Sequence, residues 1–346
     1  MEQQSKNIFI CTHQELLAGI DKVLTDYKVA ALTNKAGKTL YDYVNTSNDI
    51  EFDYQPTILS PKKFFFPQNE VIVEYTADGK VAAKITAEPL VLFGVRPCDL
   101  HGIKILDEAF ADSHGDPNYL AKREKAVIIG MDCKQVCDEH AFCYRVKSNY
   151  AEQGFDLMLH DLGGKYAITV ATDKGQQFLQ DYFAADQGSQ QDLDKFLQEK
   201  QQAFADKKPF KYLDKLPEVF ATDQDKADAV FEAEGNRCLS CGSCIMVCPT
   251  CYCFDVADEL KLNLKQGERI RRWDACMLSS FAVVAGGENF RHDKTARLKH
   301  RINRKFNYLM KKHGQAVCVG CGRCVRACLA EISPKTIVEK ITGEPK

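Results

Sequence analysis

RCLSCGSCIMVCP at residues 237–249 and CVGCGRCVRACL at residues 318–329 carry the same cysteine spacing, Cys-x2-Cys-x2-Cys-x3-Cys. Three thiolates in such a tight loop can reach three irons of one [4Fe–4S] cube. The fourth cysteine starts the next helix and points toward the other cube. Because the whole pattern occurs twice, the sequence predicts two [4Fe–4S] clusters whose ligation crosses between the motifs.

The crossed pattern assigns four cysteines to each cluster. The first set is Cys238, Cys241, Cys244 and Cys328, and the second is Cys318, Cys321, Cys324 and Cys248. Glycines at positions 242, 320 and 322 keep the loops slim, so that backbone amides can turn toward the sulfides. The alternative is a pair of zinc sites, which usually use two separated Cys-x2-Cys pairs. The duplicated three-cysteine run disfavours zinc.

Composition bounds the class of protein. A chain of 346 residues that is 45% hydrophobic can bury a sizeable core and predicts about two domains. The formal charge of −2 offers no electrostatic footprint for nucleic acid or for an anionic membrane. The start of the chain shows no secretory leader, and no apolar run reaches the roughly 20 residues of a spanning helix. Sixteen cysteines in such a chain indicate metal binding in a reducing cytoplasm.

The cysteines divide the chain unevenly, with eleven of the sixteen between residues 238 and 328. The polar stretch 221–236 comes before them and resembles a linker. We therefore predict an α+β protein, with a mixed α/β domain over 1–225 and an α-helical two-cluster ferredoxin-like domain over 226–346. Hydrophobic spacing predicts these elements: a helix over 14–27, a strand over 70–75, buried strands over 89–95 and 126–131, solvated helices within 176–206 and an amphipathic helix over 295–310.

The amphipathic helix predicted over 295–310 is locally basic. Leu298, Ile302 and Phe306 fall on one face, with arginines and lysines opposite. We interpret the basic residues as a solvated face and as counter-charge for anionic clusters, in preference to a nucleic-acid site.

Several longer stretches together resemble one protein family, the β subunit of cytoplasmic sulfhydrogenases, and the A subunit of anaerobic sulfite reductase is similar. The stretches cover most of the chain: SPKKFFFP (60–67), LFGVRPCDLHGIKILDEAF (92–110), GFDLMLHDL (154–162), RCLSCGSCIMVCPTCYCFDV (237–256), ERIRRWDACM (268–277), AGGENFR (285–291) and CVGCGRCVRAC (318–328).

The resemblance implies a relay subunit that contains clusters but no catalytic centre. Members of this family work beside a flavin subunit that exchanges electrons with NAD(P)H and a catalytic subunit, here most simply a [NiFe] hydrogenase. An anaerobic sulfite reductase or a complex linked to heterodisulfide reductase is the alternative. We find no Gly-x-Ser-x-Gly, Walker A or paired-carboxylate motif, and we predict no catalytic residue. A different alternative is a subunit whose own cluster reduces sulfur or a disulfide.

A third [4Fe–4S] cluster is predicted from four cysteines that follow strand-like runs: Cys98, Cys133, Cys137 and Cys143. The family that this chain resembles has a Cys-x-Cys pair after the second run. Here Ala141 occupies the first position of that pair, and Cys137 appears earlier in compensation. Buried structural thiols are the alternative, since free cysteine packs as a small hydrophobe. Both interpretations stay open from the sequence.

Four further cysteines have no ligand role in this scheme. Cys251, Cys253 and Cys276 could lie beside a cube or hold a further centre, and the sequence leaves them unassigned. Cys11, in the apolar run IFIC, is predicted to be an ordinary packed thiol.

Overall fold

The computed structural model describes residues 8–54 and 56–344, which form two compact units. Unit 1 takes its residues from Met1–Pro61, Thr86–Glu139 and Ser148–Lys207, and unit 2 from Lys62–Ile85, His140–Lys147 and Lys208–Lys346. The chain thus enters unit 2 three times, so the contacts do not follow the single cut predicted after residue 225. The prediction of a start without a secretory leader falls partly on residues 1–7, which lie outside the described residues.

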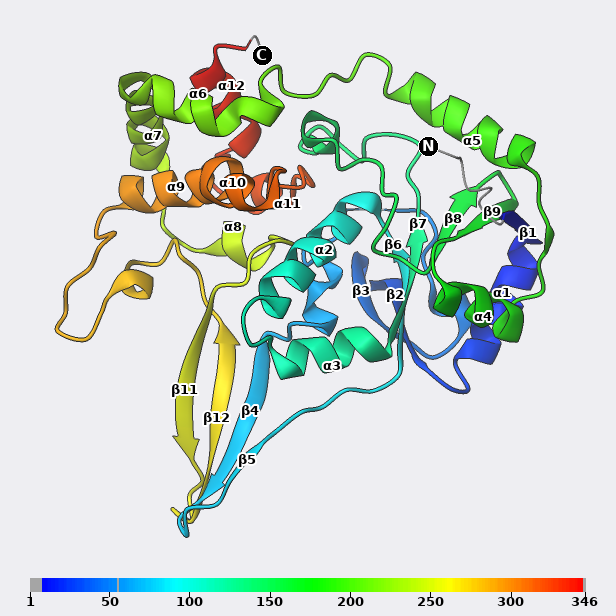
Figure 1. Cartoon of the computed structure of the whole chain (residues 1–346), viewed down its shortest axis with the longest axis horizontal. Helices are drawn as coiled ribbons and strands as arrows, with labels where there is room; N and C mark the ends of the chain where they lie inside the picture. The colour runs from blue at the N-terminus through cyan, green and yellow to red at the C-terminus, as the bar shows by residue number, and fades with distance from the viewer. Residues whose placement is uncertain (1–7, 55, 345–346) are drawn as a thin grey trace. The chain divides into compact units, whose positions relative to one another are not determined.

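Unit 1 is built on an eight-stranded sheet with the order β10-β1-β9-β8-β7-β6-β2-β3 (Figure 1). Its strands are β1 (Ile8–Thr12), β2 (Lys28–Lys35), β3 (Lys38–Val44), β6 (Leu90–Val95), β7 (Ala126–Met131), β8 (Leu157–Asp161), β9 (Lys165–Val170) and β10 (Asp186–Gln187). The pairs β2–β6, β6–β7 and β7–β8 are parallel, and the other pairs are antiparallel. Every residue of β6 and β7 is buried, which confirms the two predicted central strands.

Helices cover this sheet: α1 (His13–Val23), α2 (Pro97–Ala111), α3 (Pro117–Lys125), α4 (Asp173–Tyr182) and α5 (Gln190–Ala203). Helix α1 begins at a capping box between Thr12 and Glu15, and its residues Leu16, Ile20 and Val23 are buried at helical spacing. The predicted helix at 14–27 is thus confirmed, with its end at Val23. Helices α4 and α5 likewise bury one apolar stripe each, as the sequence predicts for 176–206.

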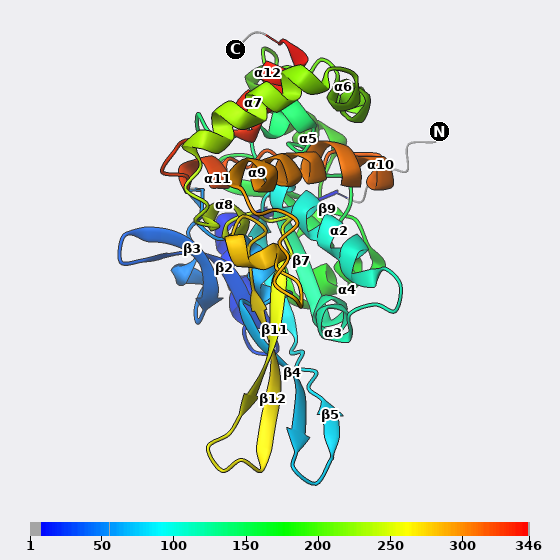
Figure 2. The same cartoon turned by 90° about the vertical axis from the view of Figure 1, so that its left-hand side faces the viewer.

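Unit 2 contains a four-stranded antiparallel sheet with the order β11-β12-β4-β5 (Figure 2). Its strands are β4 (Asn69–Thr76), β5 (Val81–Ala83), β11 (Phe254–Leu260) and β12 (Gln266–Trp273). Strand β4 confirms the strand predicted at 70–75. The predicted helical domain over 226–346 has, in addition to its helices, the hairpin β11–β12. This hairpin is sheet because β4, from far earlier in the chain, pairs along β12, and because Arg269 faces Asp258 across the hairpin at 2.8 Å.

The helices of unit 2 surround the two cysteine motifs. They are α6 (Leu216–Thr222), α7 (Gln224–Arg237), α8 (Ser243–Met246), α9 (Lys294–Asn303), α10 (Leu309–His313), α11 (Arg323–Arg326) and α12 (Pro334–Thr342), with a π-helical turn η6 (Arg304–Tyr308) joining α9 to α10. Short 3-10 turns complete the chain: η1 (Ser47–Asp49), η2 (Pro61–Phe64), η3 (Cys143–Val146), η4 (Leu213–Lys215) and η5 (Ser279–Ala282). The predicted α+β class is therefore confirmed.

Helix α7 corrects one prediction, because it occupies the polar stretch that resembled a linker. Asp223 caps its first turn, and Ala227, Phe231 and Glu234 are buried at helical spacing. A side chain at Gly235 would lie 2.3 Å from Thr295 Oγ1, so α7 and α9 approach each other closely. Packing against α9, which the local composition cannot reveal, makes this stretch a helix.

The amphipathic helix at 295–310 is confirmed by α9, η6 and α10, in which Leu298, Ile302 and Phe306 are buried. The basic residues of this helix do not all lie on a solvated face as expected, since Arg301 and Lys305 are also buried. Burial of a charge requires a compensating partner. These two side chains therefore point to the sulfur-rich interior of unit 2. Among the described residues, no helix has both the length and the apolar character needed to cross a membrane.

Candidate metal centres

Each cysteine motif folds as a loop followed by a single helical turn. The turns α8 and α11 begin directly after Gly242 and Gly322, which have φ of 77° and 73°. Glycine adopts this left-handed conformation without the steric cost that a Cβ imposes. The third cysteine of each motif consequently lies inside the turn and the fourth just after it, which separates the fourth sulfur from the other three.

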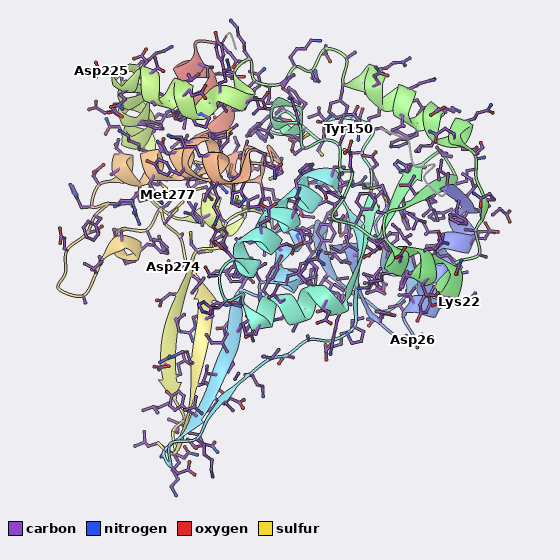
Figure 3. All side chains as sticks on the ribbon, in the orientation of Figure 1. Lys22, Asp26, Tyr150, Asp225, Asp274 and Met277 are labelled. Atoms are coloured by element: carbon purple, nitrogen blue, oxygen red, sulfur yellow. The ribbon has the colours of Figure 1, made fainter. Side chains whose placement is uncertain are left out.

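A first cavity, with about 450 Å³ of empty space, is lined by the sulfur-bearing residues Cys238, Cys241, Cys244 and Cys328. These are the four cysteines of the first predicted set. Apolar side chains complete the wall, among them Met277 and Leu298. Met277 follows strand β12, and Figure 3 labels it together with Asp274 between that strand and the helices of unit 2.

A second cavity, with about 390 Å³ of empty space, is lined by the other four cysteines: Cys248, Cys318, Cys321 and Cys324. The structure therefore brings the cysteines together in crossed sets, with the last cysteine of each motif beside the first three of the other. The empty spaces of the two cavities, each counted together with the solvent at its mouth, are also similar in volume.

Glycine is needed where the second motif meets residues 140–143. Gly320 has φ of 59°, and a Cβ at this position would lie 2.6 Å from the backbone of Phe142 and Cys143. The Phe142 N–H donates a hydrogen bond of 2.6 Å to the Gly320 carbonyl oxygen. The segment before Cys143 thus presses directly on the cysteine loop, which only a residue without a side chain permits.

Arg301 provides positive charge to both cavities, because its side chain lines each of them. Burial opposes its charge, but the sulfurs of Cys244 and Cys324 outweigh burial and raise the pKa of Arg301. Among the residues that the structure describes, none accepts a hydrogen bond from its buried Nε. A cationic donor with this unused N–H between two cysteine quartets fits anionic iron–sulfur clusters, whose sulfides accept hydrogen bonds.

Lys305 lines the second cavity and is absent from the lining of the first. Burial opposes its protonation, but Cys248, Cys251 and Cys318 outweigh burial and raise the pKa of Lys305. Arg301 thus lines both cavities, whereas Lys305 lines only the second.

Backbone amides also reach the cysteine sulfurs. The Ser240 N–H donates to Cys238 Sγ and the Ile332 N–H donates to Cys328 Sγ, each at 3.4 Å. Hydrogen bonds to cluster sulfurs are one of the means by which a protein sets the reduction potential.

The four cysteines of the third predicted set lie in both units. Within unit 1, Cys98 lies in the first turn of α2 just after β6, and Cys133 follows β7. Because β6 and β7 are parallel neighbours, both residues lie at the same edge of the sheet. Cys137 is exposed in the following loop. Cys143 is buried at the start of η3 in unit 2.

Two buried cations lie near Cys133 in unit 1. Arg96 donates a hydrogen bond of 2.9 Å to the carbonyl oxygen of Asp132, and the ammonium of Lys200 pairs with the Asp132 carboxylate. By contrast, burial and then Glu15 raise the pKa of Cys11 to about 12, which confirms the prediction of a packed thiol.

The cysteines that the sequence left unassigned line a third cavity in unit 2, which sequence reasoning missed. Cys251, Cys253 and Cys276 meet there beside several cationic side chains, around about 980 Å³ of empty space. The only sequence signal is that these three cysteines remain after the cluster ligands are assigned, and sequence spacing cannot show that they converge with the arginine-rich helix. Within residues 8–54 and 56–344, no group of three His, Cys, Asp or Glu side chains is arranged to hold a metal ion.

Comparison with known proteins agrees with the cysteine geometry. Residues 237–332 match the family model described as "4Fe-4S dicluster domain". The chain is similar to sulfhydrogenase 2 subunit beta of Pyrococcus furiosus, with 36% identity over an alignment of 313 residues that covers 87% of this chain and 88% of the relative. The dicluster match removes the zinc alternative and indicates two [4Fe–4S] clusters. The chain therefore belongs to the sulfhydrogenase beta-subunit family and is an iron–sulfur electron-transfer subunit with two [4Fe–4S] clusters.

Proposed function

We propose that this chain relays electrons, within a cytoplasmic oxidoreductase complex, between a flavin-containing NAD(P)H-linked subunit and a catalytic [NiFe] hydrogenase subunit. The observation that carries the proposal is that one buried cation, Arg301, lines both cysteine-lined cavities. Two redox sites that share a wall are close enough in space to exchange electrons. The name of the relative, a sulfhydrogenase subunit, supports a hydrogenase as the catalytic partner.

The residues of the chain prepare the two cavities for a change of charge. When bound, each [4Fe–4S] cluster takes up and releases one electron. Arg301 and Lys305 place fixed positive charge where the added electron would reside, in a buried region where screening by water is weak. Met277, Leu298 and Ile332 give the first cavity an apolar wall. No proton transfer to substrate is required, and none of these residues is assigned as an acid or base.

We further propose the crossed ligand sets, which a pair of double variants tests. Cys321→Ser removes a proposed ligand of the second cluster and leaves the first as the only intact cluster of the two motifs. In that background, adding Cys328→Ser should abolish the signal of the first cluster in electron paramagnetic resonance, while adding Cys248→Ser should leave it. The reverse result would mean that each motif binds its own cluster without crossing.

We also propose the third [4Fe–4S] cluster on Cys98, Cys133, Cys137 and Cys143. The shared sheet edge of Cys98 and Cys133 and the buried cations Arg96 and Lys200 support it. The double variant Cys98→Ser/Cys133→Ser should then lose about four irons per chain relative to the wild type. Cys11→Ala, which removes a packed thiol from unit 1, should lose none. Equal iron contents in all three proteins would show that the N-terminal cysteines are structural thiols.

The choice of partners is tested by anaerobic affinity purification of the tagged chain from its own cells. Co-purified nickel and flavin would support the proposed hydrogenase complex. Siroheme in place of nickel would identify a sulfite reductase complex instead. A flavin protein with neither nickel nor siroheme would favour a complex linked to heterodisulfide reductase. Recovery of the chain without any of these cofactors would contradict the proposed relay between subunits.

A further inference from the structure

The third cavity of unit 2 contains a pair of cysteines that belong to neither cluster set. Cys253 and Cys276 both line this cavity, and the thiol and backbone N–H of Cys276 lower the pKa of Cys253. The two residues come together because Cys253 directly precedes β11, Asp274 directly follows β12, and the Asp274 N–H donates to the Cys253 carbonyl oxygen at 3.0 Å. Cys251, the third cysteine of the cavity, instead donates its N–H to the carbonyl oxygen of Cys248, a member of the second cluster set, at 3.4 Å. Cys253 and Cys276 therefore form a separate pair.

The wall around this pair is cationic. Arg291, Arg301, Arg304 and Lys305 line the cavity, and its lining includes no aspartate or glutamate. Among the described residues, none of the four forms an ion pair with a carboxylate. The Nε atoms of Arg291 and Arg301 are buried and have no hydrogen-bond partner within residues 8–54 and 56–344. Arg301 and Lys305 also face the cluster cavities, but Arg291 and Arg304 line this cavity alone of the three.

The third cavity is also open to solvent and larger than the two cluster cavities. Cys253 and Arg304 are partly exposed, whereas Cys276 is buried behind them. The empty space of this third cavity, counted with the solvent at its mouth, is about 980 Å³. It is larger than the spaces of about 450 and 390 Å³ at the two cluster cavities, counted in the same way. Arg304 and Lys305 belong to the π-helical turn η6, a distortion that occurs frequently at functional sites. Arg304 is held in place by a hydrogen bond of 2.6 Å to the Tyr252 hydroxyl.

We propose that this cavity is a thiol–disulfide exchange site for a small anionic disulfide, with Cys253 as the attacking thiolate and Cys276 as the resolving thiol. The cations bind the anionic groups of the ligand and stabilise the thiolate that leaves. Cys253 is suited to attack because it is the more exposed of the two and shares the cavity lining with Arg304 and Lys305. This site goes beyond the electron relay, because it performs covalent chemistry.

The exchange balances in three steps. The Cys253 thiolate attacks the ligand R–S–S–R, which forms a Cys253–S–S–R bond and releases R–S⁻. Cys276 then attacks Cys253 Sγ, which forms the Cys253–Cys276 disulfide and releases a second R–S⁻ and a proton. Two electrons and one proton break that disulfide and restore the thiolate and the thiol. The electron-transfer activity of this subunit supplies the electrons one at a time, and the net reaction converts R–S–S–R and two electrons to two R–S⁻.

The test uses the anaerobically purified holoprotein and 5,5′-dithiobis(2-nitrobenzoate), a doubly anionic disulfide whose thiolate product is coloured. In Cys276→Ser the exchange should stop after one step, and mass spectrometry should find the probe attached to Cys253. The wild type should instead contain the Cys253–Cys276 disulfide and release one more coloured thiolate per chain than the variant. Absence of the probe from Cys253 in Cys276→Ser, with iron and sulfide contents unchanged, would overturn the proposal.

Charge recognition is tested by the double variant Arg291→Gln/Arg304→Gln. Its rate of reaction at Cys253 with the anionic probe should fall roughly tenfold, as expected when steering charges are removed. Its rate with the uncharged 2-hydroxyethyl disulfide should change much less. The control Arg269→Gln removes a charge from β12 outside the cavity lining and should leave both rates unchanged. Equal losses with both probes would contradict an anion site.

A further measurement separates the proposal from a metal-binding role for the same cysteines. Iron and sulfide are counted in Cys253→Ser/Cys276→Ser and in the wild type. Equal contents support the exchange site. Loss of about four irons per chain would show that the pair ligates another cluster, and this would overturn the proposal.

Discussion

Lys62 Nζ donates a hydrogen bond of 2.7 Å to the carbonyl oxygen of Cys251, a residue 189 positions later in the chain. The Lys62 side chain is buried and lies 4.1 Å from the centre of the Trp273 ring. Lys62 thus holds the loop that follows the first cysteine motif through a long-range hydrogen bond. Burial lowers the pKa of this lysine, while the nearby sulfurs of Cys251 and Cys248 oppose that shift.

Lys62→Met should destabilise unit 2 while preserving the length of the side chain. The variant loses the charged hydrogen bond to Cys251, and such bonds contribute about 1.5–3 kcal/mol. We expect the free energy of unfolding, measured by anaerobic chemical denaturation, to fall by about 2 kcal/mol. The neighbouring variant Lys63→Met, at a more exposed position, serves as the control and should change it by less than about 0.5 kcal/mol. Similar losses in both variants would argue against the Lys62 contact.

Arg301→Met should lower the reduction potentials of both clusters, because this cation lines both cavities. Lys305→Met should lower only that of the second cluster, since Lys305 lines its cavity and is absent from the first. A lost charged hydrogen bond of about 1.4 kcal/mol corresponds to about 60 mV for a one-electron couple. Redox titration followed by electron paramagnetic resonance measures both potentials. Equal shifts of both clusters in Lys305→Met would contradict this assignment.

Gly320→Ala should prevent the second cluster from being held, because its Cβ would lie 2.6 Å from the backbone of Phe142 and Cys143. Gly314→Ala is the matched control, since Gly314 also has a positive φ, 67°, but open space around a Cβ. Both variants carry the same left-handed strain of about 1 kcal/mol. Only Gly320→Ala should lower the iron and sulfide content. A loss in both variants would assign the effect to backbone strain alone.

The alkylation of Cys253 by iodoacetamide should show a distinctive pH dependence. The hydrogen bond from Cys276 lowers the pKa of Cys253 below its ordinary 9.0, with help from Arg304 and Lys305. Since the thiolate is the reactive form, the rate should rise with pH and reach its plateau below pH 9. Peptide mass spectrometry measures the rate at this residue. Cys276→Ala, which removes the thiol donor, should move the midpoint toward higher pH.

His300 provides the control for the pH profile. Burial, and then Arg291 and Arg304, lower the pKa of His300 to about 4, so its ring is neutral throughout the measured range. His300→Gln should therefore leave the midpoint of Cys253 alkylation unchanged. A shift comparable to that of Cys276→Ala would mean that the histidine, and not the thiol pair, controls this reactivity.

The sequence by itself determined the features that depend on local spacing. The two cysteine motifs, the buried strands β6 and β7 and the helix that includes Leu298 and Ile302 are each contained in one short stretch of chain. Their hydrophobic periods and ligand spacings therefore reveal them directly. Family membership depends on the same local information, since each motif that carries the resemblance is contiguous in the chain.

Only the tertiary structure decided what surrounds those motifs. Lys62 reaches Cys251, residues 140–143 press on Gly320, and Cys253 shares a cavity with Cys276 and with the cations of η6. Each contact joins segments that are separated in sequence, so it depends on backbone pairing and burial that no local pattern contains. The buried charge of Arg301 has the same origin. A basic helix face is ordinarily solvated, and here the sulfur atoms of two distant motifs compensate its burial.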